Sequence, residues 1–126
     1  MEKDKLVTPH ITLWFQDGIL YGRYTEGLDV SLEVAKELVE SRIIYSEGKS
    51  CALLIDMRGI KSATLHAREY LATIGATHLK AAALIVGSKL ERTTGNIFLM
   101  IDKPLVPTRL FTNEARAVGW LKHYCP

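Results

Sequence analysis

Two uninterrupted apolar runs constrain the fold of this sequence more than any other feature. Cys51–Ile55 reads CALLI and Ala81–Val86 reads AAALIV, and neither run alternates with polar residues. A half-buried strand shows a period of two, whereas a strand that is covered on both faces is apolar throughout. Apolar residues at helical spacing lie between the two runs. We therefore expect parallel strands joined by right-handed crossovers in an α/β fold.

A hairpin is predicted ahead of these strands. Apolar residues alternate with polar ones from Ile11 to Phe15, and Ile19 to Tyr24 supplies the returning strand. Asp17-Gly18 lies between them and is the strongest two-residue hairpin signal, because both positions tolerate positive φ. Trp14 and Tyr21 or Tyr24 either face outward, which would favour a homodimer, or are covered by the first helix.

Three helices follow from apolar spacing and capping residues. The first is capped by Asp29 or Ser31 and ends near Glu47-Gly48, and the last is capped by Thr112. Another extends from about Thr64 to about Thr77, and its predicted inner residues are Ala67, Leu71 and Ile74.

The clearest helix start in the sequence is at Ser88. Ser88 and Glu91 match the S-x-x-E capping box, in which each side chain bonds the backbone N–H of the other residue. Gly95 lies inside this helix, where it permits a close helix contact. The predicted inner face consists of Leu90, Ile97, Phe98 and Ile101.

The element order is therefore β-β-α-β-α-β-α-β-α. It predicts one domain over residues 1–126, with a mixed sheet of about five strands and four helices. Thr108 to Phe111 supplies the last strand, and the hairpin supplies an antiparallel edge. Residues 1–7 are polar, and we expect them to be loosely held.

Charge and composition narrow the function classes. The 16 basic residues alternate with 14 acidic ones and leave a net charge of +2, so we expect no nucleic-acid partner. No window approaches the run of about 18 apolar residues that spans a membrane, and the first ten residues do not resemble a signal peptide. Two isolated cysteines indicate a reducing compartment, so we expect a cytoplasmic protein. No histidine lies at metal-ligand spacing, and we predict neither metal nor cofactor.

Polar side chains cluster where the first apolar run ends, and ligands of open α/β sheets bind outside the carboxyl ends of strands. Free N–H groups at a helix start also attract anions. The candidate ligand- or partner-binding residues are Asp56, Arg58, Ser62, Thr64, His66, Arg68 and Ser88. The competing interpretation is that Asp56 caps a turn and that Thr64 and Ser88 cap helices. Ser62, His66 and Asp56 could form a triad, but they lack the glycine-flanked elbow that exposes a nucleophile, so no catalytic residue is predicted.

Three stretches resemble the SpoIIAA-like group of small regulatory domains, which includes STAS domains and anti-sigma-factor antagonists. ALLIDMRGIKS is similar to a STAS strand with the loop that follows it, and AALIVGSKLERTTGNIF is similar to the next strand and helix. PTRLFTNEARAVGWL resembles the closing strand and helix of small bacterial members, often labelled STAS/SEC14-like. The resemblance covers nearly the whole chain. It implies a SpoIIAA-like fold and a regulatory, protein-binding role.

The sequence departs from the phosphorylated members of that group at one motif. Those antagonists carry Asp-Ser-Ser-Gly at the start of the second helix, where this chain has Thr64-Leu65-His66-Ala67. His66 thus replaces the serine that accepts phosphate. The resemblance implies a non-enzymatic interaction domain whose surface includes the loop from Asp56 through Arg68. Its alternative implication is the binding of a lipid, nucleotide or other small anion, as in SEC14 and some STAS domains.

Overall fold

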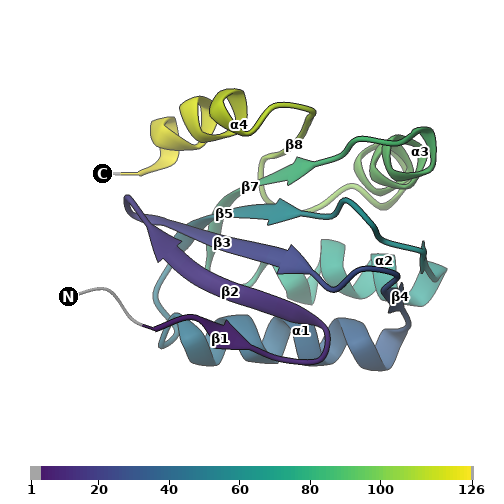
Figure 1. Cartoon of the computed structure of the whole chain (residues 1–126), viewed down its shortest axis with the longest axis horizontal. Coiled ribbons are helices and arrows are strands. Elements are labelled where there is room, and N and C mark those ends of the chain that lie inside the picture. The colour runs from purple at the N-terminus through teal and green to yellow at the C-terminus, as the bar shows by residue number, and fades with distance from the viewer. Residues whose placement is uncertain (1–3, 126) are drawn as a thin grey trace.

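The computed structural model of the chain describes residues 4–125, and its main sheet has six strands in the order β1-β2-β3-β5-β7-β8 (Figure 1). The first three strands pair antiparallel, and the last four pair parallel. Their bounds are β1 Leu6–Val7, β2 Ile11–Gln16, β3 Ile19–Tyr24, β5 Cys51–Asp56, β7 Leu79–Ile85 and β8 Thr108–Phe111. Two short strands, β4 (Asp29–Val30) and β6 (Ser62–Ala63), form a separate parallel ladder. The predicted α/β class is confirmed; the main sheet has six strands where about five were expected, and the β4–β6 ladder was not expected.

The helices cover the two faces of the sheet unequally. Helices α1 (Leu32–Tyr45) and α2 (Leu65–Ala72) lie on one face, and α4 (Glu114–Leu121) covers the other over β5 and β7 (Figure 1). Helix α3 (Lys89–Ile97) continues directly into the π-helical turn η2 (Phe98–Asp102). Two 3₁₀ turns, η1 (Ile74–Ala76) and η3 (Lys122–Tyr124), follow α2 and α4.

The two apolar runs become the central strands. In β5, Leu53 and Ile55 face α1 and α2, whereas Ala52 and Leu54 face α4. In β7 the residues on the α4 side include two alanines, and small side chains there let Ala117 pack against the sheet. Both faces are therefore covered, which explains why neither run alternates.

The predicted hairpin forms around Asp17 and Gly18, whose φ angles are 51° and 81°. Trp14 lies opposite Tyr21, and their rings stack at 5.3 Å on the face that α4 shares. Lys5 lies over the Trp14 ring at 4.8 Å. The first helix does not cover these two rings, because it packs on the opposite face, where Tyr24 lies.

Three local predictions are wrong. Residues 1–3 of the segment expected to be loose lie outside the described residues, but Leu6–Val7 is not loose, because Leu6 pairs with Leu13 and packs against the core. The second helix ends at Ala72, and Ile74, expected to be buried, is 52% exposed in the 3₁₀ turn that follows. The cap of the last helix is Asn113 rather than Thr112, because the Asn113 side chain accepts a hydrogen bond from the Arg116 N–H.

Helix α3 is rotated relative to its predicted orientation. Of the four residues expected to face inward, only Phe98 packs against the core. Leu90, Ile97 and Ile101 are 56%, 36% and 69% exposed. The face that does pack inward contains Gly95, where an added Cβ would lie 2.7 Å from a methyl carbon of Leu110. Gly95 therefore permits close contact with strand β8, rather than with another helix.

Candidate functional site

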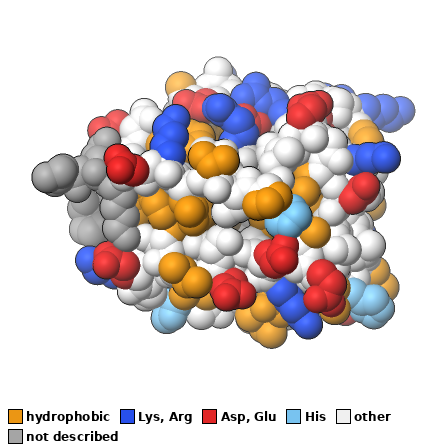
Figure 2. Space-filling model, turned by 60° about the horizontal axis from the view of Figure 1, so that its bottom comes forward, with side chains coloured by type: hydrophobic (Ala, Val, Ile, Leu, Met, Phe, Trp, Pro, Cys, Tyr) orange, Lys and Arg blue, Asp and Glu red, His pale blue; other side chains and the backbone are white. Residues whose placement is uncertain are grey.

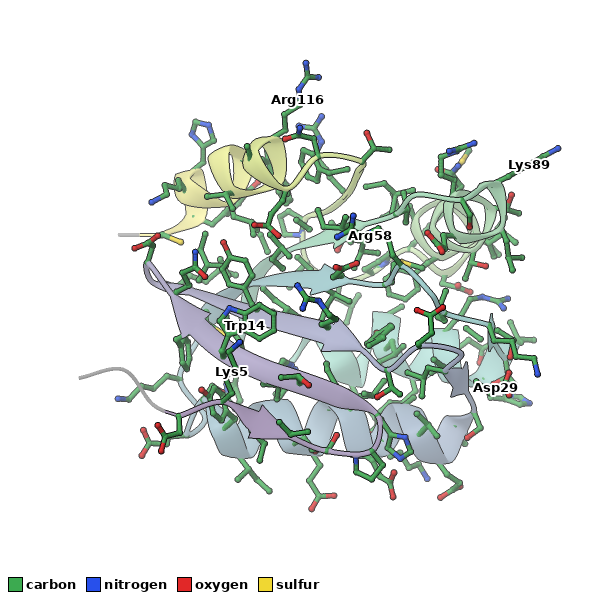
Figure 3. All side chains as sticks on the ribbon, viewed as in Figure 1. Lys5, Trp14, Asp29, Arg58, Lys89 and Arg116 are labelled. Atoms are coloured by element: carbon green, nitrogen blue, oxygen red, sulfur yellow. The ribbon has the colours of Figure 1, made fainter. Side chains whose placement is uncertain are left out.

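The residues at the carboxyl end of β5 form an ion pair. The Arg58 Nε and Nη2 groups donate to the two carboxylate oxygens of Asp56 at 2.9 and 2.8 Å. The backbone N–H of Arg58 also donates to Asp56, and Arg23 Nε lies 3.5 Å from its Oδ2. In Figure 3, Arg58 lies beside the ends of the central strands. Burial alone would raise the pKa of Asp56, but its bonds to Arg58 outweigh burial and hold that pKa below its usual value.

The start of α3 contains a filled anion site. The Glu91 carboxylate accepts hydrogen bonds from the backbone N–H groups of Gly87, Ser88 and Gly59 at 2.7, 2.9 and 2.9 Å. The Ser88 hydroxyl in turn accepts from the Glu91 N–H at 3.1 Å, which completes the predicted capping box. Burial would raise the pKa of Glu91, but the three N–H donors lower it overall. An external anion would have to displace this carboxylate to use the same N–H groups.

The residues that follow Ser62 do not converge with Asp56. The Ser62 hydroxyl donates to the Asp29 carboxylate at 2.6 Å, next to the β4–β6 ladder. Thr64 caps α2 by accepting from the Ala67 N–H at 3.1 Å. These bonds place the Ser62 hydroxyl on Asp29 and the Asp56 carboxylate on Arg58, so the triad considered from the sequence is not assembled.

Arg68 and His66 lie on α2 in contrasting environments. Arg68 Nε donates to Asp102 Oδ2 at 2.9 Å, and its Nη1 donates to the Ala63 carbonyl. The Asp102 side chain is only 2% exposed, so this ion pair ties the start of α2 to the end of η2. The His66 side chain is 77% exposed, with Nδ1 4.0 Å from the Glu69 carboxylate.

Sequence reasoning missed the long-range bonds by which three carboxylates hold this region together. Glu91 bonds Gly59, Asp29 bonds Ser62, and Asp102 bonds Arg68. The capping box pointed to Glu91 only as a local cap. Its bond to Gly59 joins residues 32 positions apart, and the bonds to Asp29 and Asp102 span 33 and 34 positions. No local pattern indicates contacts of that range.

Surface charge is mixed on the face shown in Figure 2, where acidic and basic side chains are interspersed among small groups of hydrophobic ones. Among residues 4–125, no cluster of three or more His, Cys, Asp or Glu side chains could hold a metal ion. Within the same residues, no helix is both long and apolar enough to cross a bilayer.

The Asp56 ion pair makes a testable contribution to stability. A carboxyl whose folded-state pKa is depressed stabilises the fold above its unfolded pKa of about 4 and loses that contribution as pH falls. We expect Asp56→Asn to lower the free energy of unfolding by about 1–3 kcal/mol at pH 7. Urea denaturation from pH 7 to pH 3 measures the effect, and the gap between variant and wild type should close toward pH 3. A gap of constant size would contradict the charge-based explanation.

The mixed six-stranded sheet, with helices on both of its faces, is an α/β fold of SpoIIAA-like type. A crystal structure of an uncharacterised DUF3478-family protein from Shewanella loihica, described as having a SpoIIAA-like fold, matches with a TM-score of 0.58. It is 18% identical, and the match covers 88% of this chain and 91% of that one. The predicted SpoIIAA-like resemblance is thus confirmed for the fold.

The family follows from the sequence itself. Residues 13–125 match DUF7793, a domain of unknown function, and the chain belongs to that family. No curated protein matches this chain.

Proposed function

We propose that this protein is a non-enzymatic regulatory domain that binds a partner protein through the outer face of α3 and η2. The observation that carries the proposal is a stripe of exposed apolar side chains, here called the α3–η2 stripe. Its residues and exposed fractions are Leu90 56%, Ile97 36%, Met100 70% and Ile101 69%. Adjacent large apolar side chains that remain in water are typical of interaction surfaces.

The stripe residues have the spacing of one apolar helix face. Leu90, Ile97 and Ile101 are separated by seven and four residues, which places them on one side of a helix. The neighbouring side of the helix carries Glu91, whose carboxylate binds backbone N–H groups, and Phe98, which packs into the core. The helix is thus held by its polar and small residues, and its apolar stripe is left for a partner.

Charge around the stripe favours one kind of partner. Lys89, Arg92 and Lys103 are exposed, and Lys89 extends away from the body of the protein in Figure 3. The two acidic side chains of the same segment, Glu91 and Asp102, are buried and bonded within the chain. A partner with apolar anchors flanked by carboxylates therefore complements this surface. A second copy of the same surface would bring like charges together.

Part of the surface expected from the sequence adjoins the stripe. The Arg68–Asp102 ion pair joins α2 to η2, and the exposed residues at the start of α2 are Leu65, 51% exposed, and His66. We include both in the proposed surface. Asp56, Arg58, Ser62, Thr64, Arg68 and Ser88 support it through their bonds within the chain.

The test compares capture of acidic amphipathic helical peptides by matched variants. We expect Ile97→Ser with Ile101→Ser to weaken binding at least tenfold, because apolar anchors dominate such interfaces. Ile44→Ser on α1 is the control, since Ile44 is 65% exposed outside the stripe. Lys89→Glu with Lys103→Glu should also weaken binding, and its difference from wild type should grow as the salt concentration is lowered. Equal binding by all variants, or a dimer that the stripe substitutions dissociate, would overturn the proposal.

A second candidate function is the binding of a small molecule. The observation in its favour is an apolar cavity of about 110 Å³ between the sheet and its helices, on the side away from α4. Binding of a free anion at the start of α3 is less well supported, because Glu91 already fills that position.

A further inference from the structure

The cavity lies inside the domain, beneath the face of the sheet that α1 and α2 cover. Side chains from the sheet and from the surrounding elements line it, among them Leu38, Leu53, Leu71, Ala82, Phe98 and Val106. Its volume of about 110 Å³ is comparable to an engineered apolar cavity of about 150 Å³ that holds benzene. The cavity thus has room for an apolar group of about six non-hydrogen atoms.

The cavity is not sealed. Among its lining residues, Ala76, Leu79, Pro104, Val106 and Thr108 keep partial contact with solvent. They come from η1, from β7, from the segment that leads into β8 and from the first residue of β8. A small molecule could therefore reach the interior between these elements without unfolding the sheet.

Among the described residues, two charged side chains line this apolar space, Arg42 and Arg68, and Arg68 is already paired with Asp102. Arg42 of α1 is 4% exposed, and its Nη2 donates to the carbonyl oxygens of Gly75 and Thr77 at 3.0 and 2.9 Å. Within residues 4–125, its buried Nη1 has no hydrogen-bond partner. Burial lowers the pKa of Arg42, and the Cys51 thiol is the group that opposes this effect. No carboxylate among residues 4–125 contributes to the shift.

A buried guanidinium nitrogen without an acceptor is costly, because desolvation of a charged donor is not compensated. The two bonds from Nη2 fix the plane of the group, so the direction of the Nη1 donors is also fixed. A carboxylate oxygen is the acceptor that guanidinium groups bind best in a protein interior.

We propose that this cavity binds a small monocarboxylate with an apolar body, such as a short fatty acid or an aromatic acid, with its carboxylate on Arg42 Nη1. The apolar walls hold the body of the ligand, and Arg42 selects for the acid over neutral molecules of the same shape. A phosphate ester fits less well, because its three oxygens require more donors than the cavity offers. The proposal deepens the second candidate function and does not depend on the α3–η2 stripe.

The experiment titrates the purified protein with benzoate and hexanoate, and with benzyl alcohol and hexanol as neutral counterparts. We expect an acid to raise Tm by about 5 °C at ten times its Kd, and each alcohol to bind at least tenfold more weakly. Calorimetry gives the affinities independently.

Two variants separate the roles of the cavity and of Arg42. Ala82→Leu places three more carbons in the cavity, so it should abolish binding of acids and alcohols while the protein stays folded. Arg42→Lys keeps a positive charge but loses the fixed geometry, so acids should bind at least tenfold more weakly and alcohols unchanged. Circular dichroism confirms that both variants are folded.

The outcomes separate two claims: that the cavity binds small molecules, and that Arg42 makes it prefer acids. If acids and alcohols bind equally and Ala82→Leu abolishes both, the small-molecule function stands and the role of Arg42 is overturned. If neither acids nor alcohols bind the wild type, the small-molecule function and the carboxylate site on Arg42 both fail. An internal water then satisfies Nη1 instead.

Discussion

Replacing Asp102 by Ala will lower the free energy of unfolding by about 3–5 kcal/mol, the range observed when one partner of a buried ion pair is removed. The Asp102 side chain is 2% exposed and that of Arg68 is 18% exposed, so neither charge is screened well by water. Without the carboxylate, Arg68 keeps its bond to the Ala63 carbonyl but loses its counter-charge in a largely dry site. Urea denaturation at pH 7 measures the loss.

A control for this prediction lies on the same helix. Glu69 is 57% exposed and lies 4.0 Å from His66, so Glu69→Ala should change stability by about 0.5 kcal/mol or less. A double-mutant cycle between Arg68→Ala and Asp102→Ala isolates the coupling of the pair from the packing of each side chain. A loss below about 1 kcal/mol for Asp102→Ala would show that the site is wetter than its burial indicates.

The same substitution bears on the proposed interface. Asp102 is the last residue of η2, and its ion pair with Arg68 fixes the end of the α3–η2 segment on α2. Freed from that anchor, the segment should lose protection from amide exchange around Met100 and Ile101. The ion pair therefore stabilises the fold and also holds part of the apolar stripe in place.

The architecture was predictable because it depends on strong local signals. The runs at Cys51–Ile55 and Ala81–Val86 needed cover on two faces, and the structure supplies it with α4 on one side and α1 and α2 on the other. Asp17-Gly18 set the hairpin by backbone chemistry alone, since both residues adopt positive φ. These features act within a few residues of the chain, so a sequence pattern reports them.

The orientation of α3 was not predictable in the same way. An apolar stripe on a helix normally faces the core, and Leu90, Ile97 and Ile101 formed such a stripe. The structure turns it outward because Glu91 bonds a loop residue 32 positions earlier and Gly95 approaches Leu110. Both contacts bring together distant parts of the chain, and together they outweigh the burial that the stripe would gain.

The candidate site shows the same limit. The residue types around Asp56 were those of an anion site, but Arg58 pairs with Asp56, and Glu91 fills the backbone N–H groups nearby. One of these carboxylates, that of Glu91, was not placed by any sequence pattern near the loop after β5. Arg42 was not predicted as a site residue, because a single arginine within a helix gives no sign that it is buried beside a cavity.

Replacing Glu91 by Gln will lower the free energy of unfolding by about 2–4 kcal/mol, because one residue accepts from three backbone N–H groups and completes a capping box. The glutamine amide keeps the size of the side chain but has one acceptor oxygen in place of two charged ones. Its NH₂ group also faces backbone donors. We expect the first turn of α3 to fray, with faster amide exchange from Lys89 to Arg92.

The pH dependence identifies charge as the cause of this loss. The folded-state pKa of Glu91 is depressed, so its contribution is complete above the unfolded pKa of about 4.3 and disappears as pH falls through the folded value. Wild type and Glu91→Gln should thus differ most at pH 7 and converge toward pH 3. Glu114→Gln, in the first turn of α4 with the Asn113 cap intact, is the control and should cost less than about 1 kcal/mol. A difference between wild type and Glu91→Gln that stays constant down to pH 3 would mean that shape, rather than the bound carboxylate, joins α3 to the loop after β5.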